Sequence, residues 1–343
     1  MSDVYDPTRL GQANNTGDTD ALFLKVFSNE ILATFEKTQI MKPLHTIRTI
    51  SSGKSATFAT IGTATAAYHT PGENIMTKSH DHDADGSTAQ VSKYTTNFNM
   101  NEQVINIDKM LVSSTFIPNL DELKNHFDVR GQFSRELGTA LAQRFDRAVL
   151  KTLAAGATDS SAQPSGQPAG INFNGATSNG TELVSTIAKI AQLLDENDVP
   201  DDGTRFAILK PEEYYKLVST DNIAIQKDYG GSGGVAAGNI PQIAGINIYK
   251  SNNLKAVAVA SQPDSDDSLS NNDVFGGSGA GYNPTNLSST VILGGHPSAV
   301  GTVKLLDLAT ESDYSVQHQG TLMVAKYAMG HAVLRAGACV NVT

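Results

Sequence analysis

The sequence contains one cysteine, Cys339, and no tryptophan among its 343 residues. A single thiol cannot form an internal disulfide, so the chain is not a secreted disulfide scaffold and is compatible with a reducing cytoplasm. No apolar run reaches the roughly 20 residues that a membrane-spanning helix needs. The first residues, MSDVYDPTRL, lack the basic and apolar regions of a signal peptide. These absences predict a protein that does not enter a membrane.

Basic residues are also scarce relative to acidic ones. The chain has 25 Lys and Arg against 35 Asp and Glu, which gives a formal net charge of −10. This charge disfavours a protein that binds free nucleic acid, because the average surface repels phosphate. It does not exclude a protein that encloses DNA. With 39% hydrophobic and 17% charged residues, the composition is that of a globular protein with a substantial core.

Recognisable catalytic motifs are missing as well. The segment SSGKSA (51–56) resembles the end of a phosphate-binding loop, but Arg48 stands where that loop requires a glycine. The glycine-rich stretch 229–238 lacks the preceding strand and following helix of a dinucleotide site. Histidines 126, 296, 318 and 331, with Asp307 and the serines, could in principle form a triad, yet no G-x-S-x-G elbow is present. We therefore predict no enzyme activity, no catalytic residue and no cofactor.

One segment, DHDADG (81–86), reproduces the start of a calcium-binding loop. Asp81, Asp83 and Asp85 occupy ligand positions, but Ser92 replaces the glutamate that should close the loop. His80 and His82 add potential ligands for softer metals. A solvated turn is the favoured interpretation, so no metal site is assigned. A metal-binding surface protein stays open as an alternative.

The most informative stretch runs from Leu120 to Ala155 and predicts one long helix. Asp121 and Glu122 fall in its first turn, where the helix dipole favours negative charge, and Gly156 is expected to end it. Its apolar residues stand mostly four apart: Leu123, Phe127, Phe133, Leu137, Leu141, Phe145, Val149 and Leu153. Such a helix is roughly 50 Å long, and steps of four make its apolar stripe wind around the axis. The two ends should therefore bury different faces, in a spine shared by several layers or subunits.

Before this helix, the chain changes character twice. Residues 1–19 read as a flexible arm, and a short amphipathic helix follows in 20–38. Two strand-like pieces, SATFATIG and QVSKYTTNFNMNEQVINID, then flank a polar middle. We expect an extended hairpin with little core of its own, which is marginal in water unless it packs on a neighbouring chain.

After the long helix, a Gly-, Ser- and Pro-rich linker (157–180) leads into alternating helices and strands. We expect a helix at 181–194, a buried strand RFAILK, a helix from Pro211, a strand IAGINIYKS, a long loop at 262–286, and two strand-rich segments that finish the chain, AVGTVKLLDL and TLMVAKYAMGHAVLRAGACVNV. Cys339 sits in the last of these as a small buried hydrophobe. This order predicts a mixed sheet and an α+β protein.

Several long segments also resemble one known family. They are ALFLKVFSNEIL, RTISSGKSATF and AAYHTPGEN near the start, HFDVRGQFSRELGTALA in the long helix, NDVPDDGTRFAILKPEEYY and IPQIAGINIYKSNNL in the middle, and SAVGTVKLLDL with AKYAMGHAVLR near the end. On these residues the chain resembles the major capsid proteins of short-tailed bacteriophages, podoviruses of the coliphage type. The likeness covers most of 21–335 and is weak in 157–180 and 262–290.

The resemblance implies an HK97-type capsid fold with four parts. Residues 1–46 would be the N-terminal arm with its short helix, and 47–110 the extended hairpin called the E-loop, which lies across an adjacent subunit. Residues 111–160 would hold the spine helix of the P-domain, completed by 300–343. Residues 161–299 would form the A-domain.

The resemblance further implies a structural protein of the virion, assembled in the host bacterial cytoplasm into hexamers and pentamers of an icosahedral head around double-stranded DNA. It implies a portal or connector protein at one vertex. Because the recognisable pattern begins by about Ala21, we expect a separate scaffolding protein. An encapsulin-like compartment shell is the alternative. Candidate inter-subunit contacts are Phe23, Phe27, Arg48, Lys54, Phe58, Tyr68 and Glu73. For the four aromatic residues among them, burial in the core of the subunit is an equal alternative.

Overall fold

A computed structural model of the chain describes residues 40–61, 66–69, 71–72, 75, 100–107, 110–120, 130–158, 168–219, 240, 242–254, 287 and 289–343. Five predicted features lie outside these ranges: the arm 1–19, the helix in 20–38, the polar segment around 81–86, the glycine-rich stretch 229–238 and the loop 262–286.

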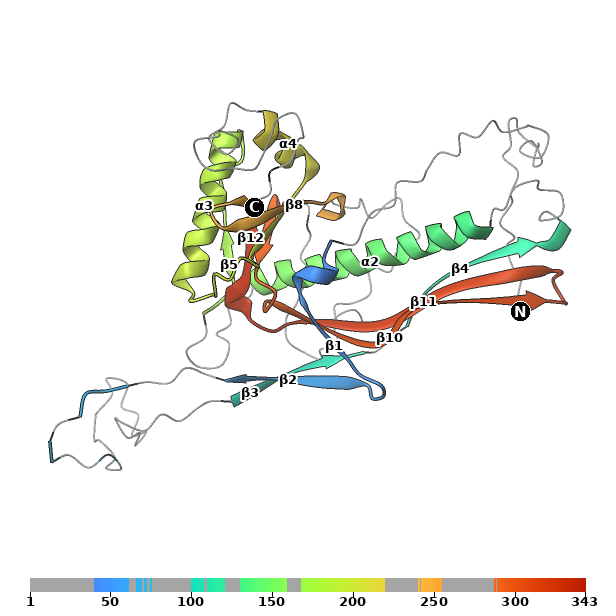
Figure 1. Ribbon diagram of the computed structural model, residues 1–343, viewed down its shortest axis with the longest axis horizontal. Coiled ribbons are helices and arrows are strands. Elements are labelled where there is room, and N and C mark those ends of the chain that lie inside the picture. The colour runs from blue at the N-terminus through green and yellow to red at the C-terminus, as the bar shows by residue number, and fades with distance from the viewer. Residues whose placement is uncertain are drawn as a thin grey trace.

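The described part forms two sheets, a separate two-stranded ribbon and three α-helices (Figure 1). The helices are α2 (Arg130–Thr158), α3 (Gly180–Glu196) and α4 (Pro211–Ser219), and short 3-10 turns lie at Lys42–Leu44 (η1), Asn252–Leu254 (η3) and Ala336–Ala338 (η5). The strands are β1 (Thr46–Thr49), β2 (Ser55–Ile61), β3 (Met100–Asn106), β4 (Leu111–Pro118), β5 (Ile171–Phe173), β6 (Phe206–Leu209), β7 (Gln242–Ile243), β8 (Ile246–Lys250), β9 (Ile292–Gly295), β10 (Val300–Ser315), β11 (Gly320–Val333) and β12 (Cys339–Val342).

The four-stranded sheet has the order β1-β10-β11-β4 and is dominated by a long hairpin. Strands β10 and β11 pair antiparallel from Val300↔Val333 to Ser315↔Gly320, with register shifts next to Leu306. Such bulges bend a strand and increase its twist. The hairpin therefore curves as it extends beneath α2 to the far end of the molecule (Figure 1).

The six-stranded sheet has the order β5-β12-β9-β6-β8-β7 and is mixed, as the sequence predicted. Pairs β12–β5 and β6–β8 are parallel, whereas β12–β9, β6–β9 and β7–β8 are antiparallel. All four residues of β6 are buried, which confirms the buried strand expected in RFAILK. Helix α3 begins where Asn179 accepts a hydrogen bond from the Glu182 backbone N–H, and α4 begins at Pro211 as predicted.

Three local predictions differ from the structure. The expected linker 157–180 contains β5, which pairs with β12 at one edge of the six-stranded sheet. The segment IAGINIYKS is a hairpin, because Ala244 (φ 49°) and Gly245 (φ 80°) form a tight turn between β7 and β8. The last strand, β12, belongs to the six-stranded sheet and not to the sheet of β10 and β11.

Helix α2 joins the two sheets, as its winding apolar stripe suggested. It contacts β4, β10 and β11 of one sheet and β5, β9 and β12 of the other. Leu141, Phe145, Val149 and Leu153 are all at most 4% exposed. Residues 119–120 are helical, and 121–129 lie outside the described ranges, so the predicted start at Leu120 stays a prediction.

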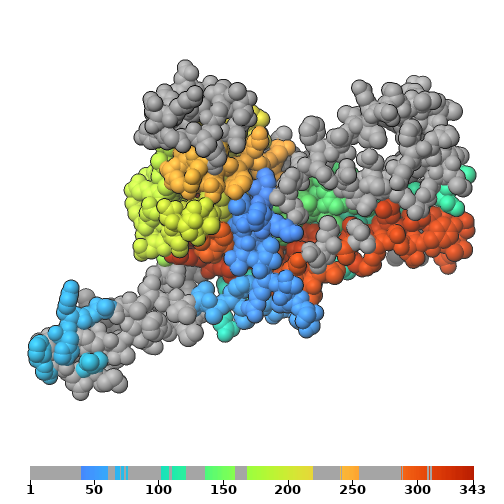
Figure 2. Space-filling view, viewed as in Figure 1, coloured from blue at the N-terminus to red at the C-terminus, as the bar shows by residue number. Residues whose placement is uncertain are grey.

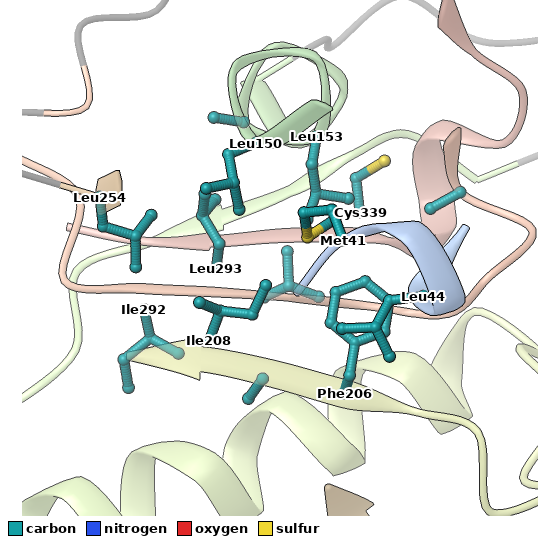
Figure 3. Close-up of a cluster of buried hydrophobic side chains, with 14 of the residues drawn as sticks. Met41, Leu44, Leu150, Leu153, Phe206, Ile208, Leu254, Ile292, Leu293 and Cys339 are labelled. Carbon is teal, nitrogen blue, oxygen red and sulfur yellow. The ribbon is translucent and has the colours of Figure 1, made fainter. Parts of the chain in front are cut away.

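The main core forms where α2 meets the six-stranded sheet and the segment just before β1 (Figure 3). Leu150 and Leu153 of α2 lie above Leu293 and Ile208 of the sheet, and Met41 and Leu44 enter from the side. Cys339 is 0% exposed in this core, which confirms its expected role as a buried apolar residue. One continuous core therefore fixes three segments that are far apart in sequence.

The predicted end of the helix at Gly156 is wrong, because α2 continues through Thr158. The glycine instead permits close packing. An added Cβ at Gly156 would lie 2.8 Å from both Cys339 Sγ and Val333 Cγ2. The position therefore needs a residue without a side chain because β11 and β12 approach the helix there.

This packing yields a stability prediction for Gly156→Ala. In an open helical position the change would stabilise by about 1 kcal/mol through helix propensity. Here we expect a net destabilisation of about 1–3 kcal/mol from overpacking. Urea denaturation of the purified chain measures it, with Gly138→Ala as the control, since nothing lies within 4 Å of a Cβ at Gly138. Val333→Ala should reduce the cost of Gly156→Ala, and strict additivity of the two changes would contradict this explanation.

Candidate assembly surfaces

The two-stranded ribbon of β2 and β3 is separate from the two larger sheets in the described part of the chain. It pairs antiparallel from Ser55↔Asn106 to Ile61↔Met100, which confirms the predicted hairpin pairing. In Figure 1 the ribbon lies beside the body, on the side of the four-stranded sheet away from α2. A ribbon of this length cannot bury enough apolar surface to be stable alone.

The root of the ribbon is fixed by a small second core. Ala56, Ile105 and Ile107 of the ribbon segment are buried against Val303 of β10 and Ala328 and Ala332 of β11. Gly330 allows this contact, because a Cβ there would overlap the carbonyl oxygen of Asn106 and lie 3.3 Å from Ile105 Cγ2. The ribbon is thus held rigidly at one end, while Val104 remains 41% exposed.

The structure brings together two of the predicted contact residues, Arg48 and Phe58. The Arg48 guanidinium lies 5.7 Å from the centre of the Phe58 ring and donates a hydrogen bond to the Thr57 carbonyl at 2.9 Å. This contact ties β1 to β2 within one subunit. Both residues therefore already have partners inside the chain, although Arg48 remains exposed.

The other predicted contacts fall in different places. Lys54 is exposed in the turn before β2, where its carbonyl accepts the Ile107 N–H at 2.7 Å. Tyr68 is 98% exposed, the highest value among the large apolar side chains that are described as exposed. Phe23, Phe27 and Glu73 lie outside the described residues. The high exposure of Tyr68 leaves its proposed contact with a neighbour possible in geometry, although a single exposed ring does not by itself mark a partner surface.

Further exposed apolar residues follow the four-stranded sheet to its far end. They are Met110, Val112, Leu120, Tyr314 and Val316, each between 46% and 70% exposed. The register Gly320↔Pro118 places the end of β4 beside the turn between β10 and β11. Sequence reasoning did not select these residues, because single apolar residues in polar surroundings give no periodic signal.

Residues 40–45, which we call the strap, cross α2 just before β1. The buried carboxylate of Asp146 in α2 accepts hydrogen bonds from the backbone N–H groups of Ile40 (3.1 Å) and Met41 (3.3 Å). Burial raises the pKa of Asp146, and these hydrogen bonds, with one from the Asn253 side chain, oppose the increase. Met41 and Leu44 are buried. These contacts fix the strap across α2.

Replacing Asp146 tests the strap directly. Asp146→Ala would leave two backbone N–H groups without their acceptor, and we expect a loss of about 1–3 kcal/mol. Asp146→Asn should cost less, because the amide oxygen can still accept a hydrogen bond and no charge is buried. Amide hydrogen exchange at Ile40 and Met41 measures the effect. Unchanged protection in Asp146→Ala would show that the carboxylate does not hold the strap.

One cationic and two aromatic side chains form a cluster on α4 and β8. The Lys250 ammonium group lies 5.1 Å from the Tyr214 ring centre and 5.2 Å from that of Tyr215. Tyr215 is 53% exposed, whereas Tyr214 is buried and its hydroxyl accepts the Ile240 N–H at 3.0 Å. This cluster lies on α4 and β8, and Figure 2 shows the orange segment that contains β8 beside the yellow-green α3, away from the ribbon.

The motifs considered for enzyme chemistry find no catalytic setting among the described residues. The segment 51–56 is a bend that leads into strand β2, whereas a phosphate-binding loop must lead into a helix. Within the described ranges, no group of three or more His, Cys, Asp or Glu residues could hold a metal ion. Asp81, Asp83 and Asp85 lie outside those ranges. None of the described helices is long and apolar enough to span a membrane.

One triad-like arrangement does occur, at His296. Its Nδ1 lies 2.9 Å from Ser298 Oγ, and its Nε2 lies 3.4 Å from the Asp202 carboxylate. The same Nδ1 also accepts the backbone N–H of Ser298 at 3.2 Å. A nitrogen that already accepts this backbone bond is a poor base for the serine hydroxyl. The arrangement instead ties the loop after β9 to the loop before β6.

The chain was compared with known proteins. Residues 57–343 match the family described as Gp10A-like, Major capsid protein. The chain is 33% identical to the major capsid protein of Enterobacteria phage T3, over 97% of this chain and 95% of that protein. It is 32% identical to the major capsid protein of Escherichia phage T7, over 94% and 93%. The capsid structure of the cyanophage P-SCSP1u superposes with a TM-score of 0.72 at 34% identity, covering 98% of both chains.

Proposed function

This chain belongs to the Gp10A-like family of major capsid proteins, and we propose that its copies form the hexamers and pentamers of an icosahedral phage head. Its fold is the HK97-type capsid fold, and its role is that of a structural protein of the virion shell. The division into N-terminal arm, E-loop, P-domain and A-domain is part of the proposal, with the ranges 1–46, 47–110, 111–160 completed by 300–343, and 161–299. Within 300–343, however, β12 pairs with β5 and β9 in the six-stranded sheet of the A-domain range.

The observation that carries the proposal is the ribbon of β2 and β3. Ile105 at its root is buried in one cluster with Ala328 of β11, whereas Val104 of the ribbon is 41% exposed and Tyr68, beyond β2, is 98% exposed. A rigid root with an uncovered surface suits an element that lies on the next subunit. Repeating one modest contact around a closed shell multiplies its contribution to stability.

The remaining candidate contacts take different roles in this proposal. Tyr68 and Lys54 face the neighbour, whereas Arg48 and Phe58 stiffen the ribbon from within the subunit. Phe23, Phe27 and Glu73 are proposed to contact adjacent subunits on the strength of the family resemblance. The exposed residues Leu120, Tyr314 and Val316 give the far end of the four-stranded sheet a further apolar contact.

The partners of the shell are also proposed. A separate scaffolding protein guides assembly in the host cytoplasm, a portal protein occupies one vertex, and the shell encloses double-stranded DNA without reading its sequence. No catalytic role is proposed, because the His296 arrangement has a structural explanation. The acidic balance of −10 favours a container from which DNA can be released.

Electron microscopy of the purified chain, expressed with and without a candidate scaffolding protein, tests the proposal. We expect closed shells of uniform size with the scaffold and irregular shells or capsomers without it. A chain that stays monomeric at high concentration under both conditions would contradict the proposed function. Uniform shells without scaffold would contradict only the need for a separate scaffolding protein.

A further inference from the structure

The face of α2 that points away from the core carries a row of basic residues. Arg144, Arg147 and Lys151 are spaced three and four apart, so they share one side of the helix over about 10 Å. At 100° per residue this side is opposite Phe145 and Val149, which are buried in the core. We call these three cations the basic ridge. All three are partly buried.

The described residues supply no anion to the two arginines of the ridge. Within those ranges no hydrogen bond or ion pair reaches the guanidinium of Arg144 or Arg147, and Arg147 Nε is buried without a partner. The adjacent carboxylate, Asp146, is turned to the strap and bonded to Ile40 and Met41. A partly buried cation without a counter-charge is unfavourable. The ridge is therefore suited to an anion from outside the subunit.

The ridge and the ribbon lie on opposite sides of the four-stranded sheet. Helix α2 packs on the side where Ala325 and Tyr327 are buried with Phe145, and the ribbon root packs on the side of Val303 and Ala328. Figure 1 shows the same arrangement, with α2 and the ribbon separated by β10 and β11. A shell built from this subunit thus has one helix side and one ribbon side.

We propose that the helix side faces the interior of the shell and that the basic ridge contacts phosphates of the enclosed DNA. This inference rests on the proposed function. DNA carries about one negative charge per 1.7 Å of its axis, so a ridge of about 10 Å meets several phosphates in any register. The contact is independent of base sequence, because only charge is recognised.

A neighbouring subunit is a less suitable source of the anion. Two exposed carboxylates, one at the end of α3 and one in the loop that follows it, already have partners within the chain. Asp195 accepts a hydrogen bond from Arg205 at 2.6 Å, and Asp202 accepts bonds from Thr204 and lies beside His296. An enclosed genome, by contrast, supplies phosphate in large excess. This excess of phosphate favours DNA as the source of the anion.

Arginine footprinting of assembled particles tests the inference without any substitution. Particles filled with DNA and particles emptied of it are treated with phenylglyoxal, and modified residues are identified by mass spectrometry. We expect Arg144 and Arg147 to react several-fold more slowly in filled particles. Exposed Arg48 on the ribbon side should react equally in both, and Arg205, which is 2% exposed, should react in neither.

Each other outcome has a distinct meaning. Equal, rapid reaction of Arg144 and Arg147 in both particles would overturn the inference about DNA contact. It would not contradict the proposed function as a shell protein. Equal protection in both would also overturn it, because protein and not DNA would then cover the ridge. Failure to obtain any shells would contradict the proposed function instead.

Charge variants provide a second measurement. The double variant Arg144→Gln with Arg147→Gln should form shells of normal size but release its DNA at a lower temperature, as followed with a DNA-binding dye. Arg144→Lys with Arg147→Lys should behave like the unmodified chain, since lysine also binds phosphate as a point charge. Lys189→Gln, an exposed change on α3, is the control for the lost charge. An unchanged release temperature in the glutamine variant would overturn the inference.

Discussion

Gly330→Ala is expected to prevent shell assembly while leaving the larger core folded. The added methyl group would overlap the Asn106 carbonyl oxygen, at the point where β3 crosses β11. Backbone atoms cannot move aside as a flexible side chain can, so the ribbon root must lift from the sheet. Ile105 and Ile107 would then lose their burial against Val303. The overpacking and lost burial amount to several kcal/mol, about 1–3 kcal/mol for each effect.

The measurement combines thermal unfolding with electron microscopy of assembly reactions. We expect Gly330→Ala to retain the helical circular dichroism of α2 and α3, because the substituted side of β11 faces the ribbon and not the main core. Gly138→Ala adds the same methyl group where nothing lies within 4 Å, and it should assemble normally. Normal shells from Gly330→Ala would show that the position of the ribbon root does not control assembly.

Acid is expected to destabilise the subunit well above the pH at which most carboxylates are protonated. His331 is 4% exposed, its Nδ1 lies 2.8 Å from Thr302 Oγ1, and the Phe145 ring packs edge-on against it at 5.3 Å. Burial lowers the pKa of His331 to about 3, with a further decrease from nearby His45. The pKa of His45 is itself lowered by burial, although a hydrogen bond with the Met41 carbonyl opposes this.

The direction in which stability changes with pH depends on whether the folded or the unfolded chain binds the proton more readily. Between pH 6.5 and about 3 the unfolded chain protonates His331 and the folded chain does not, so stability decreases as the pH falls. Each pH unit in this window costs up to about 1.4 kcal/mol, or about 2 kcal/mol between pH 6.5 and 5. His45 acts in the same direction. Asp146 acts in the opposite direction, because its raised pKa lets the folded chain take up a proton more readily.

Urea denaturation of the purified chain at pH 7, 6 and 5 measures this dependence. His331→Gln can still form a hydrogen bond with Thr302 but does not titrate, so its stability should change less across the same range. His318→Gln is the control, because His318 is exposed at the turn beside Ser315. Identical pH dependence in the unmodified chain and in His331→Gln would contradict a role for His331.

The nature of most elements could be predicted from local sequence. The four-residue spacing of Leu141, Phe145, Val149 and Leu153 predicts the long helix, and their burial confirms its inner face. The continuous apolar run of β6 predicts a strand buried on both sides. The flanking strand-like pieces predict the pairing of β2 with β3. In each case, the signal lies within a few residues, because helix and strand periods are local properties.

The candidate surfaces depended much more on tertiary structure. Arg48 and Phe58 were chosen as inter-subunit contacts, but only the fold places the guanidinium over the ring within one subunit. Asp146 gave no sequence signal, because its partners Ile40 and Met41 are about a hundred residues away and bond through backbone N–H groups. The basic ridge was likewise missed, since its significance depends on the adjacent Asp146 carboxylate being bonded to the strap.

The sequence by itself determined the class of the protein, an acidic globular chain without recognisable catalytic motifs. It also predicted a long helix shared between layers and a two-stranded hairpin that buries too little apolar surface to be stable alone. Only the tertiary structure shows why positions 156 and 330 require glycine. The first looks like a helix end and the second like any strand glycine. Both are instead required where β11 meets another element. Side chains leave no space for a Cβ at Gly156, and the backbone of Asn106 leaves none at Gly330. Such contacts join segments distant in sequence, and no local pattern records them.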